Sequence, residues 1–173
     1  MTHPLSVLAP RRSVRALALM VALATIACAH AYKPYPVNTA ERGLVFGHID
    51  TPKPLEAVQL AKVMSISRPS AAVTTNGDFF FHDVEPGHYA LMQFMYEGKW
   101  HVVLTGDKDN NKQFIVDVKP GTTHYLGAYR VTGESHSFMK GDQFGLERMG
   151  KPGEREIFQR IRPLLVGTGW EKR

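Results

Sequence analysis

Short apolar runs alternate with turn-forming residues between positions 43 and 132. The runs are GLVFGHI, AVQLAKVM, AAVTT, DFFFHDV, HYALMQFMY, KWHVVL, QFIVDV and THYLGAYRV. The segments between them are short and rich in Pro, Gly, Asn and Asp, which leaves no room for crossover helices. Seven or eight strands of this length predict an all-β, two-sheet sandwich of the immunoglobulin or transthyretin type over residues 43–132. Loops this short also lead us to expect that neighbouring strands pair as hairpins.

The run DFFFHDV gives the clearest strand signal in the chain. Side chains alternate between the two faces of a strand, so Phe79 and Phe81 point to one face, while Phe80 and His82 point to the other. Burying an aromatic side chain fully contributes about 1.5–3 kcal/mol. A one-residue slip would move these rings to the wrong face, so the pattern fixes the register of the strand.

Two turn motifs flank this run. Asn76-Gly77 supplies the positive φ that a tight hairpin turn needs. Pro86-Gly87 fits the middle of a type II turn, with Pro fixing φ at the first position and Gly taking a positive φ at the second.

The pattern changes after residue 132. Residues 133–143 are polar and predict a loop, and residues 144–149 predict a last short strand. From 152 to 165 apolar side chains recur at helical spacing and predict one amphipathic C-terminal α-helix, which Pro163 ends near Arg162. Its apolar stripe suits docking on the sandwich or on a partner protein.

The first 27 residues have the pattern of a secretory signal peptide. Arg11, Arg12 and Arg15 precede an unbroken apolar run at 16–27, and no acidic residue occurs before position 28. The run is shorter than the roughly 20 apolar residues that a membrane-spanning helix needs. We therefore predict a signal peptide at 1–27, followed by an extended spacer at 28–42.

The single cysteine, Cys28, directly follows the apolar run. Thr25-Ile26-Ala27-Cys28 resembles a bacterial lipobox, in which the cysteine becomes the lipidated first residue of the mature chain. Acyl chains contribute about 0.8 kcal/mol per buried CH₂, so lipidation would anchor the protein. Because Ala29 follows the cysteine, the resemblance implies the periplasmic side of the outer membrane. Cleavage before Tyr32, after Ala29-His30-Ala31, is the alternative and would release a soluble periplasmic protein.

The central segment also carries a family resemblance. The pattern is Gly77-x-Phe79-x-Phe81-x-x-Val84-x-Pro86-Gly87-x-Tyr89. It resembles the carboxypeptidase regulatory-like, transthyretin-like domains, and the resemblance covers about residues 43–132. It implies a seven-stranded, prealbumin-type sandwich with a non-catalytic structural or binding role and no fixed catalytic residues.

Charge and motifs exclude several function classes. From residue 28 onward 18 basic residues face 16 acidic ones, a balance of +2 that does not predict nucleic-acid binding. The chain contains neither G-x-S-x-G nor HExxH, so we expect no enzymatic activity and no cofactor. The weak metal candidates are His82 and His88, six residues apart across the Pro-Gly turn, although outward strand positions favour scattered surface histidines instead.

Tyr96, Lys99 and Trp100 are the candidate contact residues, at the tip of a predicted hairpin. Aromatic rings beside a cation suit the binding of a glycan or a peptide, although Trp100 would also suit a cap on the sandwich end. The sequence thus predicts an exported, outer-membrane-anchored lipoprotein that acts as a non-catalytic binding or assembly module of the cell envelope, with an envelope protein as its partner. The alternative is a soluble periplasmic carrier or sensor of a small ligand or metal.

Overall fold

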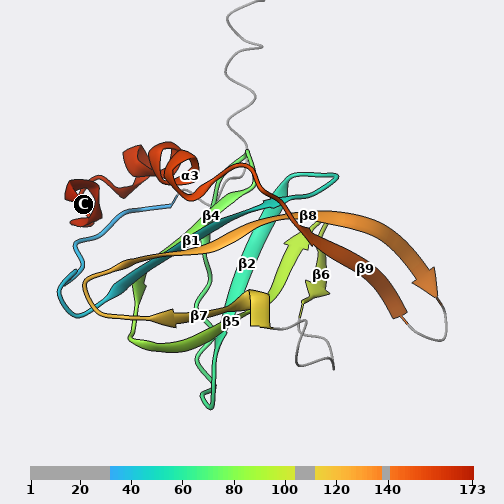
Figure 1. The fold of residues 1–173 in the computed structure, drawn as a ribbon, viewed down its shortest axis with the longest axis horizontal. Coiled ribbons are helices and arrows are strands. Elements are labelled where there is room, and N and C mark those ends of the chain that lie inside the picture. The colour runs from blue at the N-terminus through green and yellow to red at the C-terminus, as the bar shows by residue number, and fades with distance from the viewer. Residues whose placement is uncertain (1–31, 104–111, 138–140) are drawn as a thin grey trace, which may run out of the picture. The chain divides into compact units, whose positions relative to one another are not determined.

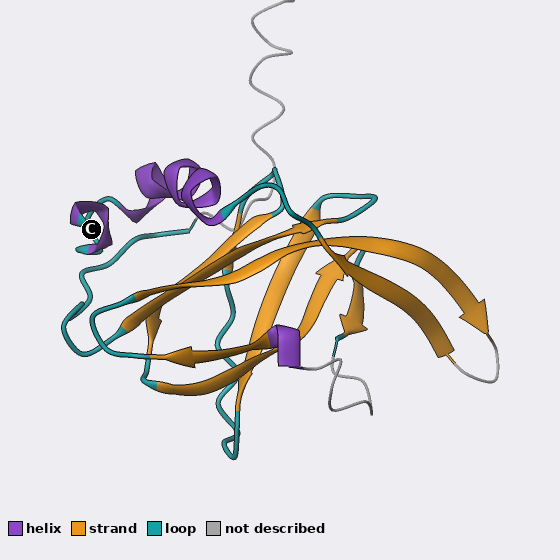
Figure 2. Ribbon diagram, viewed as in Figure 1, coloured by secondary structure: helices purple, strands orange, loops and turns teal. Residues whose placement is uncertain are grey.

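Two β-sheets pack face to face in this computed structural model, which describes residues 32–103, 112–137 and 141–173 (Figures 1 and 2). Residues 34–173 form one compact unit. The predicted all-β sandwich with a helix near its C-terminus is confirmed. The strands of the described residues are β1 (Gly43–Asp50), β2 (Leu55–Lys62), β3 (Ala72–Val73), β4 (Asp78–Val84), β5 (Gly87–Tyr96), β6 (Lys99–Val102), β7 (Ile115–Val118), β8 (Thr123–Ser137) and β9 (Gly141–Arg148).

The strands divide into a five-stranded and a four-stranded sheet. The five-stranded sheet has the order β3-β4-β1-β8-β9, with β1 and β8 parallel and its other pairs antiparallel. In the four-stranded sheet β2 pairs with one edge of β5 along its length. Strands β6 and β7 share the other edge of β5, and a 3-10 helix, η1 (Lys112–Phe114), leads into β7.

The prediction that neighbouring strands pair as hairpins is correct for only some of the connections. Hairpins join β3 to β4, β5 to β6 and β8 to β9, but the connections β1–β2, β4–β5 and β7–β8 pass from one sheet to the other. A short loop can turn a corner between packed sheets as readily as it closes a hairpin. Asn76-Gly77 does form the β3–β4 hairpin turn, with Gly77 at φ 81°. Pro86-Gly87 instead lies at a corner, and Gly87 has φ 144°.

The core lies between the sheets and confirms the predicted side-chain alternation in β4. Phe79 and Phe81 are buried in it, with their ring centroids 6.1 Å apart. Phe80 and His82 are also buried, but on the opposite face of the strand. Both faces of β4 are therefore covered.

The sandwich extends further along the chain than predicted. Residues 133–137 continue β8 and residues 141–143 belong to β9, so the loop prediction over 133–143 is wrong for both segments. Pairing between two strands satisfies backbone N–H and C=O groups whatever the polarity of the side chains. A polar sequence therefore does not exclude a strand, and the five-stranded sheet reaches Arg148.

The C-terminal segment packs on the sandwich of its own chain. It consists of α3 (Glu154–Ile161), followed by two short 3-10 helices, η2 (Arg162–Leu165) and η3 (Trp170–Lys172). The side chains of Ile157, Ile161, Leu165 and Trp170 are fully buried. Figure 1 shows α3 beside β1 and β4 of the five-stranded sheet. The apolar stripe of the predicted helix therefore serves internal docking.

Part of the predicted spacer, residues 34–42, belongs to the compact unit. Residues 34–42 contain no helix or strand. The hydroxyl of Tyr35 donates to Asp83 Oδ2 at 3.0 Å, and the backbone N–H of Val37 donates to the carbonyl of Thr168 at 3.1 Å. Among the described residues, no helix has the length and apolarity needed to cross a membrane.

Candidate functional site

The outer surfaces of the two sheets differ in what covers them. We call the outer surface of the five-stranded sheet, which lies under α3, η2 and η3, the covered face. The ring of Phe158 packs 5.6 Å from that of Phe46 there, and the indole Nε1 of Trp170 donates to the carbonyl of His82 at 2.7 Å. The outer surface of the four-stranded sheet is the open face, which we define by the outward side chains of Gln59, Gln93, Met95, Trp100, Val102 and Ile115.

Large apolar side chains remain in solvent on the open face. Trp100 is 43% exposed, Val102 54% and Ile115 47%. In β6 these outward residues alternate with His101 and Val103, which are buried against the core. The alternation places the Trp100 and Val102 side chains on the same surface.

Side-chain amides cross the middle of the open face. Gln93 pairs with Gln59 of β2 on one side and with Val102 of β6 on the other. The Nε2 group of Gln93 donates to Gln59 Oε1 at 2.7 Å, and Gln59 Nε2 donates to Ser70 Oγ at 3.3 Å. An amide carries two N–H donors and an acceptor oxygen, so this row retains hydrogen-bonding capacity toward a ligand.

The structure separates the three candidate contact residues of the hairpin. Tyr96 is 2% exposed and lies in the core, where its ring is stacked on that of His101 with centroids 4.3 Å apart. Lys99 and Trp100 are exposed, and Trp100 points to the open face. Trp100 is therefore the aromatic of this hairpin that a ligand can reach.

The two candidate metal-binding histidines lie in different sheets. His82 is in β4 and buried on the covered face, where burial lowers its pKa below the ordinary value. His88 is in β5 and exposed, with its Nδ1 3.3 Å from Asp117 Oδ1. No group of three His, Cys, Asp or Glu side chains suited to a metal occurs among the residues that the structure describes. Cys28, predicted to be lipidated, lies outside those residues.

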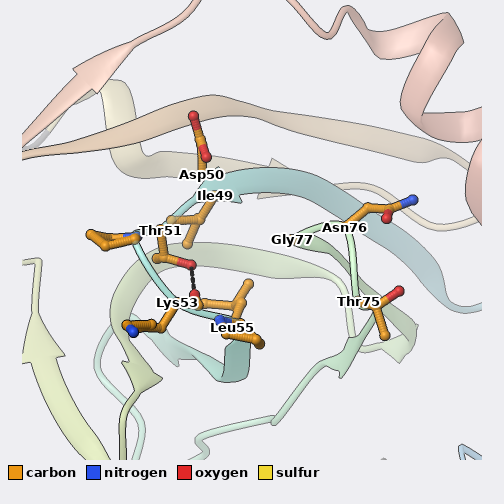
Figure 3. Close-up of a pocket in the computed structure, with 10 residues that line it drawn as sticks. Ile49, Asp50, Thr51, Lys53, Leu55, Thr75, Asn76 and Gly77 are labelled. Carbon is orange, nitrogen blue, oxygen red and sulfur yellow. Dashed lines mark hydrogen bonds between the residues drawn. The ribbon is translucent and has the colours of Figure 1, made fainter. Parts of the chain in front are cut away.

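A small polar pocket lies at one end of the sandwich (Figure 3). It has a volume of about 240 Å³ and is formed by the β1–β2 loop and the β3–β4 turn. Thr51 Oγ1 donates to the carbonyl of Lys53 at 2.6 Å within it. The Lys53 ammonium lies 3.9 Å from Glu97, in the β5–β6 turn, so the pocket adjoins the hairpin that carries Trp100.

A buried ion cluster, which the sequence did not indicate, connects α3 to the five-stranded sheet. Arg160 donates through Nε and Nη2 to the two carboxylate oxygens of Asp78, at 2.8 and 2.7 Å. His48 Nδ1 lies 2.8 Å from Asp78 Oδ1, and Asp78 is only 1% exposed. Bidentate Arg–carboxylate pairs are strong and geometrically specific. Because both carboxylate oxygens are engaged, the cluster fastens the helix to the sheet.

Comparisons with known proteins give a weak structural likeness to a solved structure. No family model matches the chain, and no curated protein matches it. A solved structure from Bacteroides uniformis, described as a candidate carbohydrate-binding protein, is 15% identical with a TM-score of 0.33. The match covers 62% of this chain and 54% of that one, so it spans about half of that protein. The resemblance to carboxypeptidase regulatory-like domains stays a prediction.

Proposed function

We propose that the protein is an exported, non-catalytic binding module of the cell envelope, and that its open face contacts the ligand. The observation that carries this proposal is the exposure of Trp100, Val102 and Ile115 on one sheet surface. Large apolar side chains exposed together on one sheet surface are typical of interaction sites in soluble domains. The outer surface of β8 and β9 is also exposed among the described residues, but the paired residues Arg130 and Glu147 there are charged rather than apolar.

The open face suits an extended ligand. Along β5 the row of Met95 and Trp100 is five residues from the row of Ala90 and Ile115, at the other end of the open face. At about 3.4 Å per residue this distance is roughly 17 Å. A surface of that length fits several units of a polymer better than one small molecule, which favours a binding module over a small-ligand carrier.

The chemistry of the open face favours a neutral glycan chain. None of the six residues that define it carries a formal charge. The indole of Trp100 offers a flat apolar surface with a polar edge, and the Gln59–Gln93 row offers donors and acceptors for hydroxyl groups. Sugar rings present apolar faces and hydroxyl edges in the same alternation. An envelope protein is the second candidate ligand, because Trp and Met are also enriched at protein interfaces.

Co-sedimentation with purified peptidoglycan, and affinity electrophoresis through soluble neutral polysaccharides, test this function. Trp100→Ala should weaken binding about tenfold, which corresponds to about 1.4 kcal/mol. Leu164→Ala, which removes an apolar side chain of similar exposure (42%) outside the open face, is the matched control. If the wild-type protein binds no glycan, and a photo-cross-linker at Val102 instead captures an envelope protein, the glycan assignment is wrong.

We further propose that residues 1–27 are removed and that lipid on Cys28 holds the module at the periplasmic side of the outer membrane. The position of Cys28 directly after the apolar run supports this proposal. Intact-mass measurement on protein from a membrane extract tests it. A mature chain that begins with acylated Cys28 is expected, whereas a chain that begins at Tyr32 would establish the soluble periplasmic alternative.

A further inference from the structure

The loop between β2 and β3 ends in an apolar tip. Met64 and Ile66 are 102% and 98% exposed, and Val63 is 51% exposed. We call residues 63–66 the tip. Figure 1 shows this loop reaching beyond the lower ends of the strands. The tip is thus convex and separate from the open face.

The tip is held in a defined conformation by hydrogen bonds at its base. The backbone N–H of Lys62 donates to the carbonyl of Ser67 at 3.2 Å, and that of Ser65 donates to the carbonyl of Lys62 at 3.2 Å. The N–H of Val63 donates to the carbonyl of His88 at 2.9 Å. Met64 has φ 60°, a left-handed conformation that non-glycine residues rarely adopt. The fold therefore maintains a strained backbone that directs apolar side chains into solvent.

Charges at the base of the tip leave one cation facing outward. The carboxylate of Glu85 is 3.0 Å from the Lys62 ammonium and 3.3 Å from the Arg42 guanidinium. These contacts lower the pKa of Glu85, with the Lys62 hydrogen bond as the largest cause, so the carboxylate stays ionised and paired. Arg68 is exposed two residues beyond Ile66. A negatively charged surface can therefore approach the tip without meeting an unpaired acid from this cluster.

We propose that the tip inserts Val63, Met64 and Ile66 into the interfacial region of a phospholipid bilayer, with Arg68 among the headgroups. Side chains that project singly from a convex loop suit a deformable apolar medium. The backbone N–H groups of Val63 and Ser65 are already hydrogen-bonded within the protein, which lowers the free-energy cost of their leaving water. The proposal is independent of the open face and of lipid on Cys28. Together with an acyl anchor, the tip would fix the orientation of the module on the membrane.

Vesicle flotation tests the proposal without the acyl chain. Residues 34–173 form a compact unit with their own core, so this part can be produced alone. The probe is vesicles of phosphatidylethanolamine with a minor fraction of phosphatidylglycerol. The double variant Met64→Asp, Ile66→Asp should lower the bound fraction about tenfold or more, because it removes both large apolar groups from the interface. Val102→Asp, which places a charge on the open face instead, is the matched control and should bind as wild type does.

A spectroscopic readout completes the test. In a Trp100→Phe background, Met64→Trp places an indole on the tip, and its emission should shift to shorter wavelength when vesicles are added. Circular dichroism and thermal unfolding show that each variant is folded. The proposal is overturned if wild-type protein does not float with vesicles, if the double Asp variant floats as well as wild type, or if binding depends only on Arg68 and disappears in salt. None of these results bears on glycan binding by the open face.

Discussion

The covered face and the open face are two outer surfaces of one sandwich, and they differ in how far their apolar side chains are exposed to solvent. On the covered face Phe46 and Phe80 are outward-pointing residues, yet each is only 1% exposed because the C-terminal segment lies over the sheet. On the open face Trp100 and Val102 occupy equivalent outward positions and remain about half exposed. The chain thus supplies its own cover where burial stabilises the fold. Apolar side chains left without such a cover fit contact with another molecule.

The largest expected effect on stability comes from disrupting the packing of the C-terminal segment, which covers the five-stranded sheet. Trp170→Ala should lower the free energy of unfolding by about 4 kcal/mol, because a fully buried indole and its hydrogen bond to the His82 carbonyl are lost. Urea denaturation followed by circular dichroism measures the change. Trp170→Phe, which keeps a ring but removes the donor, should lose clearly less. A loss below about 1 kcal/mol for the Ala variant would mean that the cover is not part of the folded unit.

The second largest loss of stability should come from the ion cluster that connects α3 to the five-stranded sheet. Asp78→Ala leaves Arg160 and His48 without their buried partner, and we expect a loss of about 3 kcal/mol in the free energy of unfolding. Asp50→Ala is the control, because Asp50 pairs with Arg130 at a similar distance of 2.8 Å but is solvent-accessible. That control should change stability by about 0–1 kcal/mol. Equal losses for the two variants would contradict the fastening role of Asp78.

A pH effect of smaller size should come from His82. Burial lowers the pKa of His82 below its ordinary 6.5, and the charge of nearby Asp83 opposes this shift only in part. The unfolded state therefore binds a proton more readily than the folded state, so stability is full above pH 6.5 and falls as the pH drops below it. Denaturation midpoints measured across this range test the sign. His82→Gln should remove part of the slope, and an unchanged slope would assign the effect to other groups.

The smallest effect on stability should come from the open face. Trp100→Ala should alter the free energy of unfolding by no more than about 0.5 kcal/mol, since its ring is 43% exposed and lies outside the core. The same variant should nevertheless weaken ligand binding about tenfold. A large loss of stability without a loss of binding would reverse the comparison between the two faces.

Local patterns predicted the parts of the fold that depend on neighbours in sequence. The alternation of Phe79 to His82 and the hairpin turn at Asn76-Gly77 follow from strand geometry and from glycine's access to positive φ, and both are present. The type II turn expected at Pro86-Gly87 is instead a corner between sheets, because the turn motif does not specify which sheet the next strand joins. That choice depends on the packing of the whole chain.

The candidate site was predictable only in part for the same reason. Trp100 was identified because an aromatic beside Lys99 and a Gly turn suggests an exposed hairpin. Tyr96 belongs to the same hairpin but lies in the core, since strand parity relative to the core is set by pairing with β2. Asp78 and Arg160 are 82 residues apart in the sequence, and no local motif predicts a contact over that separation.

A fluorescence titration of Trp100 tests the central claim most directly. In the Trp170→Phe variant, Trp100 is the single remaining tryptophan of the chain, and it reports only on the open face. We predict a saturable change in its emission when a neutral envelope glycan is added, with an affinity equal to that of the wild-type protein by co-sedimentation. If the protein binds the glycan while the emission of Trp100 stays unchanged, the ligand contacts another surface and the role assigned to the open face is wrong.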